Sequence, residues 1–278
     1  MLQFSKMHGL GNDFMVVDGV SQRFAVSNED LARLADRKTG VGFDQLLLVE
    51  PPTRQGNAFK YRIFNADGSE VSQCGNGARC FAKFVIEQSL TDLREFWVET
   101  NSGRIQLSVQ EDGQVRVNMG IPQFEPGQIP LLAESRMPRY SIDFEGQDYE
   151  FSALEIGNPH AVFQVDSVAD APVAPLGTFL QAHSRFPERV NAGFCQRISA
   201  SEISLRVYER GVGETQACGS GACAAVVAGV AAGELSEKVK VRLLGGSLDI
   251  EYAGEGEPVY LVGPATTVYR GKLSMDFL

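Results

Sequence analysis

Two cysteine motifs in this chain repeat each other, which indicates two copies of one domain. Residues 73–78 read Gln-Cys-Gly-Asn-Gly-Ala, and residues 217–222 read Ala-Cys-Gly-Ser-Gly-Ala. The two motifs lie 144 residues apart in the sequence. This spacing is far longer than the period of about 20–50 residues that marks solenoids and propellers. A chain with one thiol in each copy can hold two thiols face to face. The same offset relates further pairs upstream: Arg62 with Arg206, and Glu70 with Glu214.

Short alternating or apolar segments dominate both halves and are typical of β-strands. One prominent helix is expected in each half, starting at its cysteine motif. Apolar residues recur at helical spacing in 78–86, and 222–228 is apolar all round, as in a helix enclosed by sheet. The sequence therefore predicts an α+β fold of two homologous, pseudo-symmetric domains, each a curved, mostly antiparallel sheet wrapped around a central helix. Expected strands include 46–49, 61–64, 104–109, 115–119, 203–208, 239–243 and 259–262.

The position of the repeat predicts the domain boundaries. The first domain is expected to span residues 1–120, to carry Cys74 and to be completed by residues 265–278. The second is expected to span residues 121–264 and to carry Cys218. An active site that uses both thiols would lie in the cleft between the two domains.

Composition limits the classes of partner. A net charge of −10 argues against general affinity for nucleic acid and gives no reason to expect an anionic membrane surface. The stretch 219–233 is too short and too rich in Gly and Ala to span a bilayer. Residues 1–6 lack the basic start and apolar run of a signal peptide. We therefore expect neither nucleic acid nor a membrane as a partner.

The cysteine content favours a reduced, cytoplasmic protein. Five cysteines are an odd number and lack the dense spacing of a secreted disulfide scaffold. No C-x-x-C pair is present and there are only three histidines, so no metal site is expected. No glycine-rich nucleotide-binding pattern of Rossmann or P-loop type is present either.

The setting of Cys74 and Cys218 suits acid–base chemistry. Glycines follow each thiol and let the backbone turn tightly and approach a ligand closely. Each motif opens a helix, where unpaired backbone N–H groups and the helix dipole attract negative charge. We therefore expect both thiol pKa values to fall below about 8.5, and a substrate carboxylate to bind at the same donors. Two opposed thiols can remove a proton from one face of a carbon and return it to the other.

Other interpretations of the cysteines remain open at this point. Cys80, Cys195 and Cys223 lack the glycine frame and are expected to be small buried hydrophobic residues. Cys74 and Cys218 could instead form a reversible redox disulfide. Acyl transfer usually needs one nucleophile with a base beside it, so a symmetric pair of thiols fits it poorly.

Several polar residues are candidates for ligand contact. Glu209 and Arg210 form a charged pair suited to an ammonium and a carboxylate. His160 follows a loop of glycine, asparagine and proline, where a site role is slightly favoured over a core role. Five asparagines lie beside glycines or at strand ends, where a turn role is at least as common for any one of them: Asn12, Asn65, Asn76, Asn158 and Asn191.

The chain resembles the diaminopimelate epimerases along its whole length. The first half carries the resemblance in His8–Phe14, Gly42–Gln45, Phe64–Glu70 and Gln73–Cys80. The second half carries it in Gly157–His160, Asn191, Glu209–Gly211 and Gly213–Gly221. Either cysteine motif alone would also fit the wider superfamily that includes proline racemases, so a proline or hydroxyproline racemase is the alternative enzyme.

The resemblance implies a cofactor-independent two-base epimerase that interconverts LL- and meso-2,6-diaminopimelate in lysine and peptidoglycan precursor synthesis. Cys74 and Cys218 would be the acid–base pair, assisted by His160 and Glu209. A cytoplasmic homodimer is implied, with Tyr269 at its interface. Implied substrate contacts are Asn12, Gln45, Asn65, Gly75, Asn76, Asn158, Asn191, Glu209, Arg210, Gly219 and Ser220.

Overall fold

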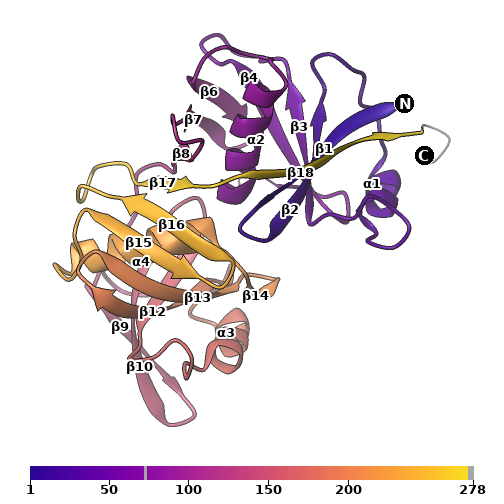
Figure 1. Cartoon of the computed structure of the whole chain (residues 1–278). Helices are drawn as coiled ribbons and strands as arrows, with labels where there is room; N and C mark the ends of the chain where they lie inside the picture. The colour runs from indigo at the N-terminus through magenta and orange to yellow at the C-terminus, as the bar shows by residue number, and fades with distance from the viewer. Residues whose placement is uncertain (72–73, 275–278) are drawn as a thin grey trace. The chain divides into compact units, whose positions relative to one another are not determined.

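The computed structural model describes residues 1–71 and 74–274 (Figure 1). Gln73 of the first cysteine motif, and residues 275–278 of the segment expected to complete the first domain, lie outside the described residues. The chain divides into two compact units: unit 1 is Met1–Asn118 with Gly263–Leu278, and unit 2 is Met119–Val262.

Unit 1 is a curved sheet with one helix against its inner face and a second against its outer face. The strands run in the order β18, β1, β2, β3, β4, β6, β7, β8, and β5 also pairs with β4. The pairs β2–β3 and β4–β6 are parallel, and the others are antiparallel. The elements are β1 (Leu2–Gly9), β2 (Asn12–Asp18), α1 (Asn28–Ala35), β3 (Gln45–Glu50), β4 (Phe59–Asn65), β5 (Glu70–Val71), α2 (Gly75–Glu87), β6 (Glu95–Thr100), β7 (Gly103–Val109), β8 (Val115–Asn118) and β18 (Thr266–Leu273).

Unit 2 repeats this topology. Its strands run in the order β9, β10, β11, β12, β13, β15, β16, β17, and β14 also pairs with β13. The parallel pairs β11–β12 and β13–β15 correspond to β2–β3 and β4–β6. The elements are β9 (Tyr140–Phe144), β10 (Gln147–Glu155), β11 (Pro159–Gln164), α3 (Val173–Ala182), β12 (Asn191–Ser199), β13 (Glu202–Glu209), β14 (Gly213–Thr215), α4 (Gly219–Ala231), β15 (Lys238–Leu243), β16 (Gly246–Glu251) and β17 (Tyr260–Gly263).

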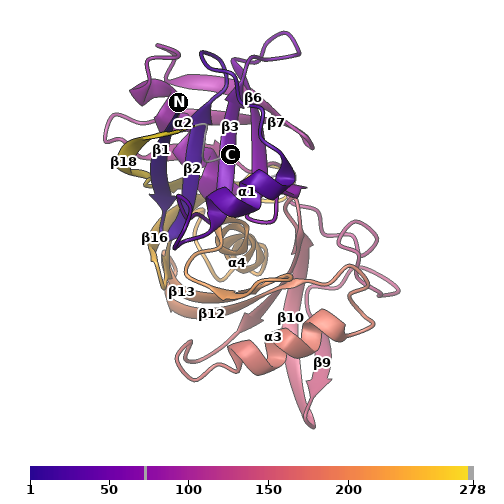
Figure 2. The ribbon, with the colours of Figure 1, turned by 90° about the vertical axis from the view of Figure 1, so that its right-hand side faces the viewer.

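The two helices that begin at the cysteine motifs are the central helices of their units, as predicted. Helix α2 contacts β1, β2, β3, β7, β8 and β18, and α4 contacts β10 to β13 and β16. Figure 2 views α4 nearly along its axis, with strands of unit 2 around it. Helix α4 is buried from Gly221 to Gly229 because it has no polar face. The fold class predicted from the sequence is confirmed.

The expectation of one helix in each half was incomplete, because each parallel crossover contains a second helix. Helix α1 joins β2 to β3, and its Leu31 and Leu34 pack on Leu46 and Leu48 of the sheet. Helix α3 occupies the equivalent crossover between β11 and β12 and packs on aromatic side chains of the sheet. The strands on either side of each crossover, β2 and β3 in unit 1 and β11 and β12 in unit 2, are therefore buried on both faces. This explains their continuous apolar sequence.

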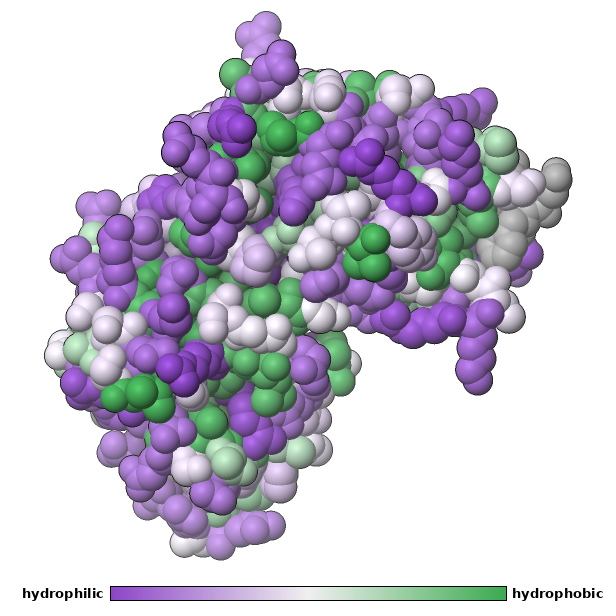
Figure 3. All heavy atoms as spheres, in the orientation of Figure 1, coloured by the Kyte–Doolittle hydropathy of each residue, from purple (hydrophilic) through white to green (hydrophobic). Residues whose placement is uncertain are grey.

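Hydrophobic side chains that remain exposed are scattered. On the face shown in Figure 3, hydrophobic residues lie in small areas separated by hydrophilic ones. Among the described residues, no helix is long and apolar enough to cross a membrane.

A buried carboxylate anchors one loop of unit 1. Glu99 of β6 is only 4% exposed. It accepts hydrogen bonds from Thr53 (backbone N–H and hydroxyl), from the Arg54 N–H and from Asn57 Nδ2. Burial raises the pKa of this carboxyl, but the donors outweigh burial and lower it to about 2. The loop between β3 and β4 is thus tied to β6 by an ionised group.

This anchor predicts a pH-dependent effect of Glu99→Gln. A lowered folded-state pKa stabilises the protein above the unfolded value of about 4.3, and this stabilisation is lost as the pH falls toward about 2. We expect the variant to have a lower melting temperature than the wild type at pH 7. The difference in melting temperature should shrink as the pH falls from about 4.3 toward about 2. Thermal melts between about pH 7 and 2.5 would measure it. Glu95→Gln, a control on the exposed side of β6, should leave the gap near zero throughout.

Candidate active site

Cys74 is the N-cap of α2. Its backbone is extended, and its Sγ accepts a hydrogen bond from the Gly77 N–H at 3.4 Å. The thiol is half-buried. A donor at the start of the helix therefore faces the sulfur, as the motif predicts.

Two of the predicted site residues lie at this thiol: Asn12 contacts it, and Asn76 contacts the same oxygen of Asn12. The Cys74 thiol lies 3.7 Å from Asn12 Oδ1, and Asn76 Nδ2 lies 3.4 Å from the same oxygen. Gln45 and Asn65 form a second pair, because Gln45 Nε2 donates to Asn65 Oδ1 at 3.0 Å. The antiparallel register of β3 and β4 places these two residues directly opposite each other.

Cys218 is the N-cap of α4, but its surroundings differ from those of Cys74. It is only 4% exposed, and its Sγ lies 3.6 Å from the Ser220 hydroxyl. Burial raises the pKa of the Cys218 thiol well above its ordinary value, and the nearby Glu209 carboxylate raises it further. The prediction of a lowered pKa at this helix start was wrong for Cys218, because burial and a like charge outweigh the helix donors. Cys218 is a protonated thiol at neutral pH.

Glu209 is positioned by the short strand β14. Thr215 of that strand donates its hydroxyl to Glu209 Oε1 at 2.5 Å. Burial raises the pKa of the Glu209 carboxyl, and hydrogen bonds from Thr215 and Cys218 oppose that shift. Unit 2 thus places a carboxyl group of elevated pKa beside a thiol of elevated pKa.

Polar residues of β11, β12 and the end of β13 form a connected group in unit 2. His160 Nε2 lies 2.8 Å from Asn158 Oδ1. Asn191, opposite His160 in the parallel register, donates to the Pro159 carbonyl at 3.2 Å and accepts from the Arg210 N–H at 2.8 Å. Asn191 therefore links the backbone ends of two strands.

The His160 ring is neutral at physiological pH. It is 1% exposed, and burial together with the nearby Arg210 charge lowers its pKa to about 3. A neutral imidazole of this kind can orient a partner by hydrogen bonding, but it does not supply a proton from an imidazolium at neutral pH.

The remaining predicted residues are two glycines and Tyr269. Gly75 and Gly219 open α2 and α4, directly after the two cysteines. Tyr269 lies on β18, 46% exposed, with its ring edge-to-face against Phe4. It lies on the strand that pairs with β1, and not among the polar groups near Cys74.

The other three cysteines are packing residues, as expected. Cys80, Cys195 and Cys223 are fully buried. Burial raises the thiol pKa of Cys80 and of Cys195 to about 12. Among the described residues, none of the five cysteines is in a disulfide.

Three residues that support these groups were missed from the sequence. Arg79 is fully buried in α2, where it donates to the carbonyls of Gly75 and Pro264. Asp44 accepts a hydrogen bond from Asn12, and Thr215 donates one to Glu209. For Arg79 the sequence offered one signal, an arginine on an otherwise apolar helical face. The contacts of Asp44 and Thr215 depend on strand pairing, which the sequence does not show.

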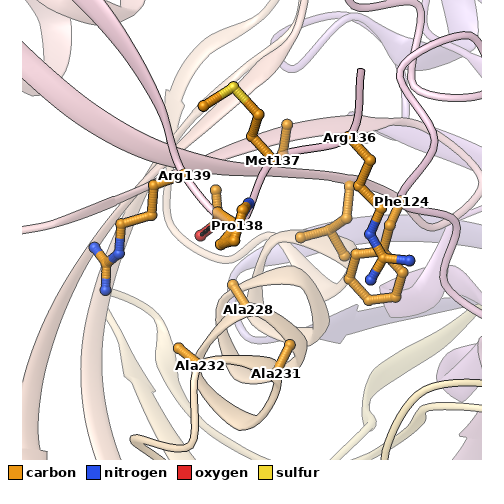
Figure 4. A pocket seen from close by; sticks show the side chains of 11 residues that line it. Phe124, Arg136, Met137, Pro138, Arg139, Ala228, Ala231 and Ala232 are labelled. Carbon is orange, nitrogen blue, oxygen red and sulfur yellow. Dashed lines mark hydrogen bonds between the residues drawn. The ribbon is translucent and has the colours of Figure 1, made fainter.

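A pocket of about 420 Å³ lies in unit 2 at the C-terminal end of α4 (Figure 4). Its floor includes Ala228, Ala231 and Ala232, and Arg136 and Arg139 line it from the segment before β9. Cys218 is at the opposite end of the same helix, and the pocket is lined by none of the residues predicted for the site. Within residues 1–71 and 74–274, no group of three or more His, Cys, Asp or Glu side chains is arranged to hold a metal ion.

Comparisons of sequence identify the chain's relatives. Residues 4–125 and 152–268 match the profile of the family described as Diaminopimelate epimerase. The diaminopimelate epimerase of Ectopseudomonas mendocina is 56% identical over 275 residues, covering 99% of this chain and 100% of that protein. The diaminopimelate epimerase of Stutzerimonas stutzeri is 53% identical with the same coverage.

Solved structures of lower identity share the fold. A hydroxyproline epimerase from Agrobacterium vitis superimposes with a TM-score of 0.72 at 16% identity, over 99% of this chain and 93% of that one. A predicted epimerase from Pseudomonas aeruginosa gives 0.69 at 15% identity, over 98% and 99%. These likenesses concern the fold alone, whereas identity above 50% across the full length concerns the family. The chain belongs to the diaminopimelate epimerase family.

Proposed function

We propose that this chain interconverts LL- and meso-2,6-diaminopimelate, with Cys74 and Cys218 as the acid–base pair and without a cofactor. The observation that carries the proposal is the repeated helix start. Two units of the same topology each place one thiol at the N-cap of their central helix. Membership of the diaminopimelate epimerase family supports the choice of substrate, and it places the reaction in lysine and peptidoglycan precursor synthesis.

The chemistry requires one thiolate and one thiol. One sulfur removes the α-proton, and the other supplies a proton from the opposite face, so the configuration inverts. Cys218 is protonated in the substrate-free protein, which is the form that supplies a proton. In the reverse direction it must lose that proton, and the adjacent Glu209 carboxyl is placed to influence this step.

Backbone N–H donors at the two helix starts would make the α-proton easier to remove. An amino-acid α-proton is a weak acid, and a thiolate alone is poorly matched to it. Backbone N–H groups at Gly75–Asn76 and Gly219–Ser220 would bind the substrate carboxylate and stabilise the negative charge that develops on it. For this, the two helix starts would approach one carbon from opposite faces, in a cleft that closes around the substrate and excludes water.

The remaining polar residues would distinguish the two ends of the substrate. Glu209 and Arg210 suit an ammonium and a carboxylate. Side-chain amides at Asn12, Gln45, Asn65, Asn158 and Asn191 add neutral donors and acceptors. His160 would assist by orienting Asn158, because its neutral ring contacts that side chain.

We also propose a cytoplasmic homodimer with Tyr269 at its interface. Val268 and Tyr269 are 57% and 46% exposed and lie side by side in sequence on β18. The dimer and the choice of Tyr269 follow the family resemblance, and these two side chains would give a second copy apolar surface to contact.

A deuterium experiment tests the proposed function. LL-diaminopimelate is incubated with the purified protein in deuterated water, without added cofactor. We expect meso product that carries deuterium at the inverted carbon. L-Proline and trans-4-hydroxy-L-proline serve as comparison substrates, because a hydroxyproline epimerase shares the fold. Turnover of these two compounds, with none of diaminopimelate, would overturn the proposal in favour of a proline-type racemase.

The same assay addresses a redox role. Cys74 and Cys218 are in the reduced state in the described part of the chain. Epimerisation is expected only in the reduced protein. A protein that shows no exchange in either redox state, yet cycles reversibly between dithiol and disulfide, would instead be a redox sensor.

A further inference from the structure

The carboxylate of Asp44 is held by three donors beside Asn12. Asp44 Oδ2 accepts from Asn12 Nδ2 at 2.9 Å and from the Asp13 N–H at 3.0 Å. Asp44 Oδ1 accepts from Arg37 Nη2 at 2.7 Å. Asp44 directly precedes β3 and Asn12 opens β2, and these two strands are parallel neighbours. The carboxylate is therefore fixed relative to both strands.

A second carboxylate completes this cluster. Asp13 binds two nitrogens of Arg37, at 2.9 and 2.7 Å, and it also binds Lys6. The Asp44 N–H in turn donates to Asp13 Oδ1 at 3.0 Å. Burial raises the pKa of the Asp13 carboxyl, but Arg37 and Lys6 hold it well below its usual range. The Asp13 carboxylate thus remains ionised at neutral pH, in one cluster with Lys6, Arg37 and Asp44.

The charge on Asp44 decides which way the Asn12 amide faces. An ionised carboxylate has only acceptors, so the NH₂ group of Asn12 must face Asp44. The opposite atom, Oδ1, then faces the Cys74 thiol at 3.7 Å and Asn76 Nδ2 at 3.4 Å. An oxygen acceptor beside a sulfur favours the thiol, and an N–H donor in its place would favour the thiolate.

The equivalent asparagine of unit 2 has a different partner. Asn158 Oδ1 lies 2.8 Å from His160 Nε2, and His160 Nδ1 is buried with no hydrogen-bond partner among the described residues. A bare nitrogen costs less at that buried position than an unpaired N–H, so the proton lies on Nε2 and is donated to Asn158. The oxygen of Asn158 therefore accepts from an imidazole, whereas the oxygen of Asn12 faces a thiol.

We propose that Asp44 is a positioning residue that fixes the Asn12 amide with its oxygen toward Cys74, and thereby raises the proton affinity of the Cys74 sulfur against the opposing effect of the Gly77 N–H donor. The catalytic meaning rests on the proposed function, in which Cys74 exchanges a proton with the α-carbon. The state of the thiol itself can be measured without any substrate. Asp44 acts through Asn12 and touches neither the sulfur nor the reacting carbon.

Asp44→Asn tests the proposal with little change of shape. The asparagine has one oxygen for donors on two sides, so it no longer forces the NH₂ group of Asn12 to face it. Alkylation of Cys74 by iodoacetamide, followed by peptide mass spectrometry as a function of pH, reports the thiolate fraction. We expect alkylation at pH 7 to rise about 2- to 10-fold, the factor that corresponds to one hydrogen bond of ordinary net strength. The pH profile of kcat/KM should move to lower pH in parallel.

Two controls separate positioning from general loosening of the segment. Asp36 caps the same segment by accepting hydrogen bonds from Lys38 and Thr39, so Asp36→Asn removes a nearby carboxylate and should leave Cys74 alkylation unchanged. Arg37→Gln removes a cation that holds Asp44 and should raise alkylation to a smaller extent. It provides a second route if Asp44→Asn fails to fold.

A double-mutant cycle identifies the path of the effect. In an Asn12→Ala background, changing Asp44 to Asn should no longer alter the alkylation of Cys74. The proposal is overturned if folded Asp44→Asn protein alkylates like the wild type, or if its effect persists without the Asn12 amide. Failure of the proposed function looks different, because the alkylation response would then be present while the wild type does not epimerise diaminopimelate.

Discussion

Replacing either Cys74 or Cys218 by alanine is expected to lower kcat/KM for diaminopimelate by about 10²- to 10⁴-fold. Each thiol serves one face of the α-carbon, so the remaining thiol cannot complete the inversion. The magnitude is that of losing a general acid or base. Neither change should unfold the protein, because alanine fits an N-cap sterically and costs only about 1 kcal/mol of helix stability. Steady-state kinetics with LL-diaminopimelate, together with circular dichroism, would measure both effects.

The chain offers a matched control for each variant. Cys80 lies in α2 and Cys223 in α4, both fully buried. Cys80→Ala and Cys223→Ala should lower stability modestly through the small cavity left behind, while kcat/KM stays within about threefold of the wild type. Turnover above a tenth of the wild-type rate in Cys74→Ala or Cys218→Ala would contradict the two-thiol mechanism.

The second large effect is expected at Gly77, in the first turn of α2. A Cβ at this position would lie 2.3 Å from the Tyr61 hydroxyl oxygen and 3.2 Å from Leu47 Cδ2. Tyr61 is 1% exposed and cannot move aside without disturbing the core. We expect Gly77→Ala to cost about 1–3 kcal/mol of unfolding free energy, as overpacking does. It should also displace the start of α2, and with it Cys74, so kcat/KM should fall. Urea unfolding and kinetics would measure the two effects.

Tyr61→Phe provides the rescue. Within residues 1–71 and 74–274 the buried Tyr61 hydroxyl has no hydrogen-bond partner, so its removal alone should cost little. In the Gly77→Ala background it removes the atom that clashes and should restore most of the lost stability. At the equivalent glycine of unit 2, a Cβ on Gly221 would meet Val207 Cγ2 at 3.0 Å, so Gly221→Ala should be milder. Equal losses at the two glycines, or no rescue by phenylalanine, would refute the steric explanation.

The duplicated motif predicted the architecture because it fixes two independent features. It marks two copies of one domain, and in each copy it marks where the central helix begins. Helix α1 was not predicted, because its eight residues give a weak periodic signal. Its N-cap is Ser27, whose side chain accepts a hydrogen bond from the Asp30 N–H. Helix α3 has no side-chain N-cap, and it contains Gly177, which allows the close approach of the Tyr208 ring.

The candidate site was predictable in its residues but not in its electrostatics. Glycines and a helix start at Cys218 indicate a lowered thiol pKa. Whether burial reverses that shift depends on contacts with Glu209, which lies on a different element and is brought close only by the fold. The same limit applies to Asp44, whose contact with Asn12 requires β2 and β3 to be parallel neighbours. Local sequence identifies the chemical groups, and tertiary pairing sets their protonation.

The pairing of β18 with β1 has a consequence for the order in which the chain can fold during synthesis. Unit 2 is one continuous segment, Met119–Val262, so it is synthesised between the two strands of the β1–β18 pair. Strand β1 (Leu2–Gly9) belongs to unit 1, and its partner Thr266–Leu273 is made only after the whole of unit 2. Strand β1 therefore waits for β18. A nascent chain of this protein exposes one edge of its N-terminal sheet until β18 has left the ribosome, and it is most exposed to mispairing and aggregation during that interval.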